Sequence, residues 1–169
     1  PPPPPPPPPG WSGGYGAPDP RLAGMPPLAG SGRRLLARII DALLVGIPVQ
    51  LFLILVGFVD WSADDPDAAY RVNVGGSAVY ALVYLLYEGY MLSSRGQTLG
   101  KMWMNIRVAM LEDGTVPSGA PGWIRAFVYT ASAWVCCLWP INVLWHLFDQ
   151  PYRQCLHDKA ARTVVVTAR

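Results

Sequence analysis

Residues 33–59 read RRLLARIIDALLVGIPVQLFLILVGFV, and this stretch decides the fold class. From Leu35 to Val59 the stretch is almost wholly apolar, and as an α-helix it would extend about 37 Å. The hydrocarbon core of a bilayer is about 30 Å thick, so this helix would cross it with some tilt. Pro48 is predicted to bend the helix. The stretch therefore predicts an integral membrane protein.

Two further apolar runs follow. Val74 to Leu92 has the length of a second crossing. The third run, Trp123 to Phe148, is interrupted by Pro140 and can be one long helix or a helical hairpin of about 123–138 and 141–150. The hairpin is favoured, because one long helix would carry a basic C-terminal tail to the outer side.

Two short segments have the pattern of β-strands, Asn105 to Leu111 and Arg162 to Ala168. Isolated strands leave backbone groups unpaired, so the two are expected to pair with each other. The predicted fold class is an all-α membrane protein. It is a small transmembrane helical bundle with two full spans, a Pro-broken third apolar run and a short cytoplasmic pair of β-strands.

The distribution of charge predicts the orientation. Arg33, Arg34 and Arg38 flank the first span, the 93–122 segment is basic, and the 60–71 loop is acidic. Basic residues stay on the cytoplasmic side of a membrane. We therefore expect a multi-pass membrane protein with a cytoplasmic N-terminus.

The composition argues against several classes of function. The 169 residues are 51% hydrophobic and 14% charged, whereas soluble domains are about 25% charged. A net charge of +2 does not indicate a nucleic-acid partner. Cys136, Cys137 and Cys155 lack metal-ligand spacing, as do His146 and His157. Because no nucleophile–base set is evident either, we predict that the protein is not an enzyme and has no cofactor or metal.

The N-terminal segment 1–32 is a domain of a different kind from the apolar region 33–169. It holds 13 of the 19 prolines, and Pro1 to Pro9 would form a polyproline II rod of about 28 Å. The rod is either a spacer, which we favour, or a ligand for an aromatic groove on a partner. Since the chain begins with proline, we expect its native start to lie upstream.

Charged residues inside the apolar runs form a candidate site. Arg34, Arg38 and Asp41 share one face of the first helix. Glu88, near the end of the second span, and Arg125, at the start of the third run, are expected at the same depth. The group is either an ion-pair cluster that joins three helices or a path for protons or cations through Asp41 and Glu88. The shallow depth favours the structural cluster, since transport sites are usual near the midplane.

Three motifs together resemble the RDD family of bacterial membrane proteins, which is named for one Arg and two Asp. They are Arg34-x-x-Ala37-x-x-x-Asp41, then Gly96-Gln-Thr-Leu-Gly100-Lys101 with Ile106-Arg107-Val108, and Leu156-His157-Asp158-x-x-Ala161-x-Thr163-Val164-Val165. The resemblance covers about residues 30–168. It implies that Arg34, Asp41 and Asp158 are the signature positions.

The resemblance implies either an accessory protein or an ion transporter. A Pro-rich leader on such a domain is similar to proline-rich members, one type of which associates with respiratory supercomplexes. We therefore expect a non-catalytic accessory or assembly subunit of a larger inner-membrane complex, whose partners are other membrane-protein subunits and the lipid bilayer. The alternative is a cation or proton transporter that uses Asp41 and Glu88.

Overall fold

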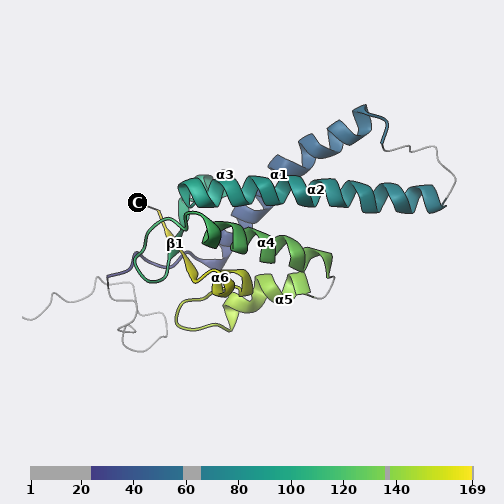
Figure 1. Cartoon of the computed structure of the whole chain (residues 1–169). Helices are drawn as coiled ribbons and strands as arrows, with labels where there is room; N and C mark the ends of the chain where they lie inside the picture. Colours follow the sequence, from purple (N-terminus) through teal and green to yellow (C-terminus); the bar gives the residue numbers. More distant parts are fainter. Residues whose placement is uncertain (1–23, 59–65, 136–137, 169) are drawn as a thin grey trace, which may run out of the picture.

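The computed structural model describes residues 24–58, 66–135 and 138–168 and is mostly helical, with one small sheet (Figure 1). The predicted leader 1–32 lies largely outside the described residues. In chain order the elements are α1 (Ser31–Leu55), α2 (Pro66–Arg95), α3 (Leu99–Trp103), β1 (Ile106–Met110), α4 (Ala120–Trp134), α5 (Leu138–Leu144), the 3-10 helix η2 (Trp145–Leu147), α6 (Leu156–Ala160) and β2 (Thr163–Thr167).

Helix α1 contains most of the stretch that decides the fold class. It begins at Ser31 and ends at Leu55, so both ends lie about four residues earlier in the sequence than predicted. The helix continues through Pro48. Among the described residues, α1 is the one helix long and apolar enough to cross a membrane. In its most apolar stretch of 18 residues, only 17% of the residues are buried in the protein. An apolar helix with so little protein cover is typical of contact with lipid or with another subunit.

Helix α2 is longer than predicted. The acidic loop was placed at 60–71, but the helix already begins at Pro66. Proline is well suited to the first helical position, because its fixed φ is helical and its missing N–H has no helical acceptor there. The segment 74–92 is helical throughout; that it crosses a bilayer stays a prediction.

The third apolar run is divided into helices, as the hairpin prediction requires, but the predicted place of the break is wrong. Helix α4 ends before Val135, which is extended. Pro140 lies in the first turn of α5, where its missing N–H costs no hydrogen bond. Across the turn, Asn142 Nδ2 donates a 2.8 Å hydrogen bond to Ser132 Oγ and joins the two arms. Cys136 and Cys137 lie outside the described residues.

The predicted strands do pair. β1 and β2 are antiparallel, with Val108 opposite Val165. On the other side of β2, Ala29 N donates to Val165 O at 3.0 Å, just before α1 begins. Val108 N donates to Gly96 O at 2.8 Å, just after α2 ends.

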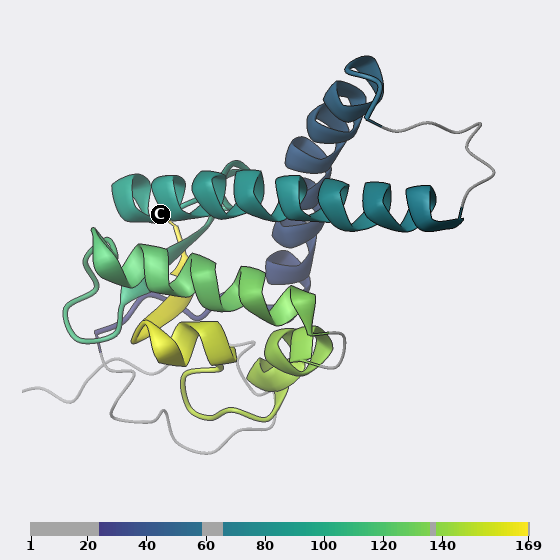
Figure 2. The ribbon, with the colours of Figure 1, turned by 45° about the vertical axis from the view of Figure 1, so that its right-hand side comes forward.

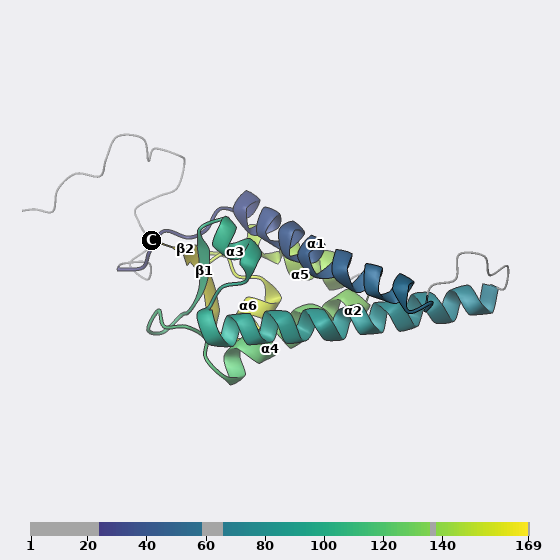
Figure 3. The ribbon, with the colours of Figure 1, turned by 90° about the horizontal axis from the view of Figure 1, so that it is seen from above.

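The start of α1, the end of α2 and the C-terminal strand are therefore fixed at one end of the molecule (Figure 3). Helix α4 runs beside α2, and α6 lies against α4 (Figure 2). If α1 and α2 both cross a membrane, the α4–α5 hairpin must return the chain to the side on which it started.

Candidate functional site: a buried charge cluster

Charged side chains gather between α1, α2, α3, α4 and α6, next to the sheet. Seven of them are at most 9% exposed, namely Arg34, Asp41, Glu88, Lys101, Arg125, His157 and Asp158. The side chain of Arg38 is 13% exposed and closes one side of the group. We call these eight residues the charge cluster. Burying so many ionisable groups is costly unless each one is paired or hydrogen-bonded.

Glu88 is the centre of the cluster. Its Oε1 lies 2.5 Å from Arg38 Nη1, 3.4 Å from Lys101 Nζ and 3.6 Å from Arg125 Nη1. Three cations from three helices thus converge on one carboxylate oxygen. The other oxygen, Oε2, is buried and has no hydrogen-bond partner among the described residues.

Asp41 is held mainly by neutral donors. Its Oδ1 accepts hydrogen bonds of 2.8 Å from Tyr87 Oη and from the backbone N–H of Gly100. Its Oδ2 accepts a 2.5 Å bond from Thr98 Oγ1, and Lys101 Nζ lies 3.9 Å away. Hydrogen bonds to a carboxylate are about twice as strong as bonds between neutral groups, so this shell fixes the position of the Asp41 side chain.

The Gly96–Lys101 motif is the loop that binds Asp41. A Cβ on Gly100 would lie 2.3 Å from Ala37 O and 2.9 Å from Asp41 Cγ, so only glycine lets α3 approach α1 this closely. Lys101, the last residue of the motif, is buried, and this burial lowers the pKa of its ammonium group to about 8 despite the neighbouring Glu88 and Asp41.

Arg125 joins α4 to α6 through Asp158. Arg125 Nε donates a 2.7 Å bond to Asp158 Oδ1, while Asp158 Oδ2 accepts the backbone N–H of Cys155 at 3.1 Å and caps α6. Burial alone would raise the pKa of Asp158, but Arg125, and less strongly Arg34, hold it well below its usual range.

Arg34 and Arg38 have partners other than those their spacing predicts. Neither pairs with Asp41, although the three residues come from one helix face. Arg38 pairs with Glu88. Arg34 donates to three backbone carbonyls: those of Ala29 at 3.0 Å, Arg153 at 2.6 Å and Val165 at 3.1 Å. The signature Arg34 therefore fixes the start of α1 to the C-terminal part of the chain.

His157 stands between the charged groups and the α4–α5 hairpin. Its Nδ1 lies 2.8 Å from Asn142 Oδ1, and its Nε2 lies 3.3 Å from Arg38 Nη2. The ring also packs edge-on against Tyr129, with centroids 5.4 Å apart. Burial, together with Arg125 and Arg38 nearby, lowers the pKa of His157 to about 3 despite the neighbouring Asp158. At neutral pH the ring is therefore uncharged and acts as a hydrogen-bonding spacer.

Mild acid is expected to destabilise the protein through His157. The pKa of this ring is about 3 in the folded chain, whereas the ordinary pKa of a histidine is 6.5. Between these values the unfolded chain binds a proton that the folded chain does not, so stability falls as pH falls. By pH 5 the loss is roughly 2 kcal/mol. His157→Gln should reduce by that amount the loss of stability between pH 7 and pH 5, measured by thermal unfolding in mild detergent. An unchanged loss in this variant would contradict the assignment.

One set of possible metal ligands occurs among the described residues. The ligand atoms of Cys155, His157 and Asp158 all lie within 4.8 Å of one another. The surroundings are unfavourable for a cation, because Asp158 is already bonded to Arg125 and burial raises the pKa of the Cys155 thiol to about 12. The group is better suited to capping α6 than to binding a metal.

The sequence-predicted site residues are partly brought together. Arg38, Glu88 and Arg125 meet as an ion-pair group, which Asp158 extends, while Asp41 and Arg34 have separate shells. Sequence reasoning missed the hydrogen-bonding partners Tyr87, Thr98, Lys101, Asn142 and His157. Only their positions in the sequence could have indicated some of these partners. Tyr87 lies beside Glu88, and Thr98 and Lys101 belong to the Gly96–Lys101 motif.

Comparison with known proteins agrees with this geometry. The sequence model of the RDD family matches residues 28–162, which include every residue of the charge cluster. No curated protein matches. No solved structure matches either. Members of this family are typically associated with membranes, as the apolar helix α1 suggests for this chain. Because the match extends over most of the sequence, the chain belongs to the RDD family.

Proposed function

We propose that the protein is a non-catalytic accessory or assembly subunit of a larger complex in the bacterial inner membrane, with a respiratory supercomplex as the proposed partner. In this role the charge cluster is structural: it holds the helices together, and we call it the clasp. The observation that carries the proposal is that the carboxylates of the cluster are held within the chain: Glu88 and Asp158 are each bonded to cations of the same chain, and Asp41 accepts three hydrogen bonds from neutral donors.

The clasp joins elements that have few other ways to associate in lipid. Apolar packing drives helix association weakly there, since lipid tails are as apolar as the side chains. Separating one charge from its partners inside the protein costs about 3–5 kcal/mol. The cluster links α1, α2, α3, α4 and α6 through Glu88 and Asp158.

The outer face of α1 supports an assembly role. Ten large apolar side chains on this helix are at least 40% exposed, namely Leu35, Leu36, Ile39, Leu43, Leu44, Ile47, Leu51, Phe52, Ile54 and Leu55. A continuous apolar face of this kind marks contact with lipid or with a neighbouring subunit.

Purification through a tag in two mild detergents, followed by mass spectrometry, tests the subunit role. We expect the same membrane proteins to be recovered in a fixed ratio to the tagged chain in both detergents. A matched variant, Leu51→Arg on the exposed face of α1, should reduce their yield while the chain itself is still recovered. Recovery of the tagged chain alone in both detergents would contradict the proposal.

We also propose a cytoplasmic N-terminus and a cytoplasmic C-terminus. The sheet supports this, because it ties the start of α1, the end of α2 and β2 to one end of the molecule. The basic residues before and inside these elements favour the cytoplasmic side for that end.

A membrane-impermeant thiol reagent applied to intact cells tests this topology. Asp64→Cys should be labelled in intact cells, whereas Arg169→Cys should be labelled only after lysis. The unaltered chain gives the background from the native cysteines. Labelling of Arg169→Cys in intact cells would show that the α4–α5 hairpin does not return the chain to the cytoplasmic side.

One observation favours the alternative, a proton or cation transporter. Glu88 Oε2 is buried without a partner among the described residues, and a buried acceptor of this kind can receive a proton or a cation. Asp41 lies close by, since both carboxylates contact Lys101.

Flux into proteoliposomes distinguishes the two functions through Asp41→Asn. The transporter requires flux in the unaltered protein and its loss in a folded variant. The clasp predicts no flux in the unaltered protein and a lower stability of the variant. Asp113→Asn is the matched control, because Asp113 is exposed in a turn and accepts its hydrogen bonds from the nearby Thr115.

A further inference from the structure

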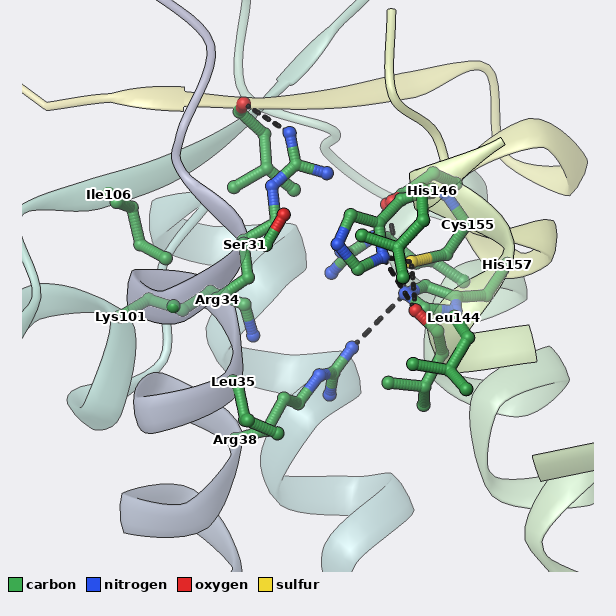
Figure 4. Close-up of a pocket in the computed structure, with 16 residues that line it drawn as sticks. Ser31, Arg34, Leu35, Arg38, Lys101, Ile106, Leu144, His146, Cys155 and His157 are labelled. Carbon is green, nitrogen blue, oxygen red and sulfur yellow. Dashed lines mark hydrogen bonds and ion pairs between the residues drawn. The ribbon is translucent and has the colours of Figure 1, made fainter. Parts of the chain in front are cut away.

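A cavity of about 220 Å³ lies beside the charge cluster. The first two turns of α1 form one wall, and α5, η2 and α6 form the opposite wall. Figure 4 shows Arg34 and Arg38 on one side and His146, Cys155 and His157 on the other. The cavity therefore lies between the start of α1 and the C-terminal part of the chain. Arg34 and Arg38 connect these two parts through their hydrogen bonds.

The mouth of the cavity is apolar. Leu35, Leu144 and Leu147 line it and are 52%, 49% and 55% exposed. Leu35 belongs to the exposed apolar face of α1, so the cavity opens onto the surface that we assign to lipid. A ligand that enters here passes between hydrocarbon side chains and then meets charged ones.

The inner wall has an excess of positive charge. Arg34, Arg38, Lys101 and Arg125 line the cavity, while Asp158 is the carboxylate that lines it and is already bonded to Arg125. The whole charge cluster has four cations and three carboxylates, with His157 neutral. Arg34 donates only to backbone carbonyls among the described residues, so its charge has no ion-pair partner there. The N–H groups of the first turn of α1, which no side chain in the described part of the sequence caps, add a partial positive charge.

Two buried side chains that line the cavity present polar atoms with no hydrogen-bond partner among the described residues. Arg125 Nη1 lies 3.6 Å from Glu88 Oε1 as an ion pair but makes no hydrogen bond there. His146 Nδ1 lies 2.7 Å from Val143 O, which places the ring proton on Nδ1 and leaves Nε2 as an acceptor without a donor. The site thus offers a cationic donor for an anionic oxygen and an acceptor for a hydroxyl group.

We propose that this cavity binds the headgroup of an anionic amphiphile that carries both a phosphate and a hydroxyl group, as phosphatidylglycerol does. The phosphate lies against Arg125, Arg38 and the start of α1, and a headgroup hydroxyl donates to His146 Nε2. A cavity of this size holds a headgroup, and the acyl chains leave past Leu35, Leu144 and Leu147. The bound lipid balances the excess positive charge and fills the space between α1 and the hairpin.

Native mass spectrometry of the full chain in mild detergent, with added lipid, tests this site. We expect one dioleoyl phosphatidylglycerol to be retained at least tenfold more strongly than dioleoyl phosphatidylcholine. Leu147→Trp, which places a larger side chain in the mouth, should reduce retention at least tenfold. Leu43→Trp is the matched control, because Leu43 is 54% exposed on α1 and does not line the cavity. It should retain phosphatidylglycerol as the unaltered chain does.

A second variant tests the hydroxyl contact. The unaltered chain should retain dioleoyl phosphatidylglycerol more strongly than dioleoyl phosphatidic acid, which lacks the headgroup glycerol and its hydroxyls, and His146→Phe should abolish that preference. Equal retention of the anionic and zwitterionic lipids, or equal loss in both tryptophan variants, would overturn the proposal. Displacement of the lipid by soluble glycerol phosphate at matched concentration would show that the site binds the free anion. That result would overturn the proposal that the ligand is an amphiphile.

Discussion

Replacing Glu88 with alanine is expected to lower the free energy of unfolding by about 3–5 kcal/mol. The substitution leaves Arg38, Lys101 and Arg125 close together in the interior without the carboxylate that each of them contacts. The loss of stability would be electrostatic, because alanine is a strong helix former and does not weaken the helical conformation of α2. Thermal unfolding and denaturant titration in mild detergent at neutral pH measure the change.

Glu112→Ala is the matched control for this variant. Glu112 also pairs with an arginine, Arg162, at 3.4 Å, but the two side chains are 71% and 77% exposed. Exposed pairs contribute about 0–1 kcal/mol, so this variant should unfold almost as the unaltered protein does. Similar losses in the two variants would contradict a special role for the buried cluster.

Replacing Gly100 with alanine is expected to cost about 3 kcal/mol. The new methyl group would lie 2.3 Å from Ala37 O, a backbone atom in the second turn of α1 that cannot rotate away. α3 would have to move outward, and the bond from Gly100 N–H to Asp41 Oδ1 would lengthen. Asp41 would then be a buried carboxyl group with one hydrogen-bond donor fewer.

Gly46→Ala is the matched control, because a Cβ at that position makes only an ordinary contact of 3.5 Å with Tyr80. Gly46 lies in the interior of α1, so alanine there should be neutral or stabilising by up to about 1 kcal/mol. Unfolding in mild detergent compares the two variants. A Gly100→Ala protein as stable as the Gly46→Ala protein would show that α1 and α3 are not in close contact.

The elements of the fold were largely predictable because each has a strong local signal. The apolar run of α1 follows from hydropathy, and the pairing of 105–111 with 162–168 follows from strand propensity and backbone hydrogen bonding. The division of 123–148 was expected from Pro140 and from the basic C-terminal tail. The boundaries were less predictable. Pro66 starts a helix and Pro140 lies inside the first turn of one, whereas sequence reasoning treated the first as loop and the second as the break.

The partners within the charge cluster were not predictable from spacing. Helix geometry places Arg34, Arg38 and Asp41 on one face, but it does not determine which neighbouring element supplies the partner. That depends on the close approach of α3 at Gly100, which places Lys101 and Thr98 against Asp41, and on the return of α6, which brings Asp158 to Arg125. Both contacts join residues far apart in the sequence.

The location of α1 in a membrane underlies the proposals above, and extraction of the membrane fraction tests it directly. We expect the full chain to stay with membranes washed in alkaline carbonate and to enter solution only when detergent is added. A chain released by the wash, and monodisperse in buffer without any detergent or lipid, would contradict the membrane location and the proposals that depend on it.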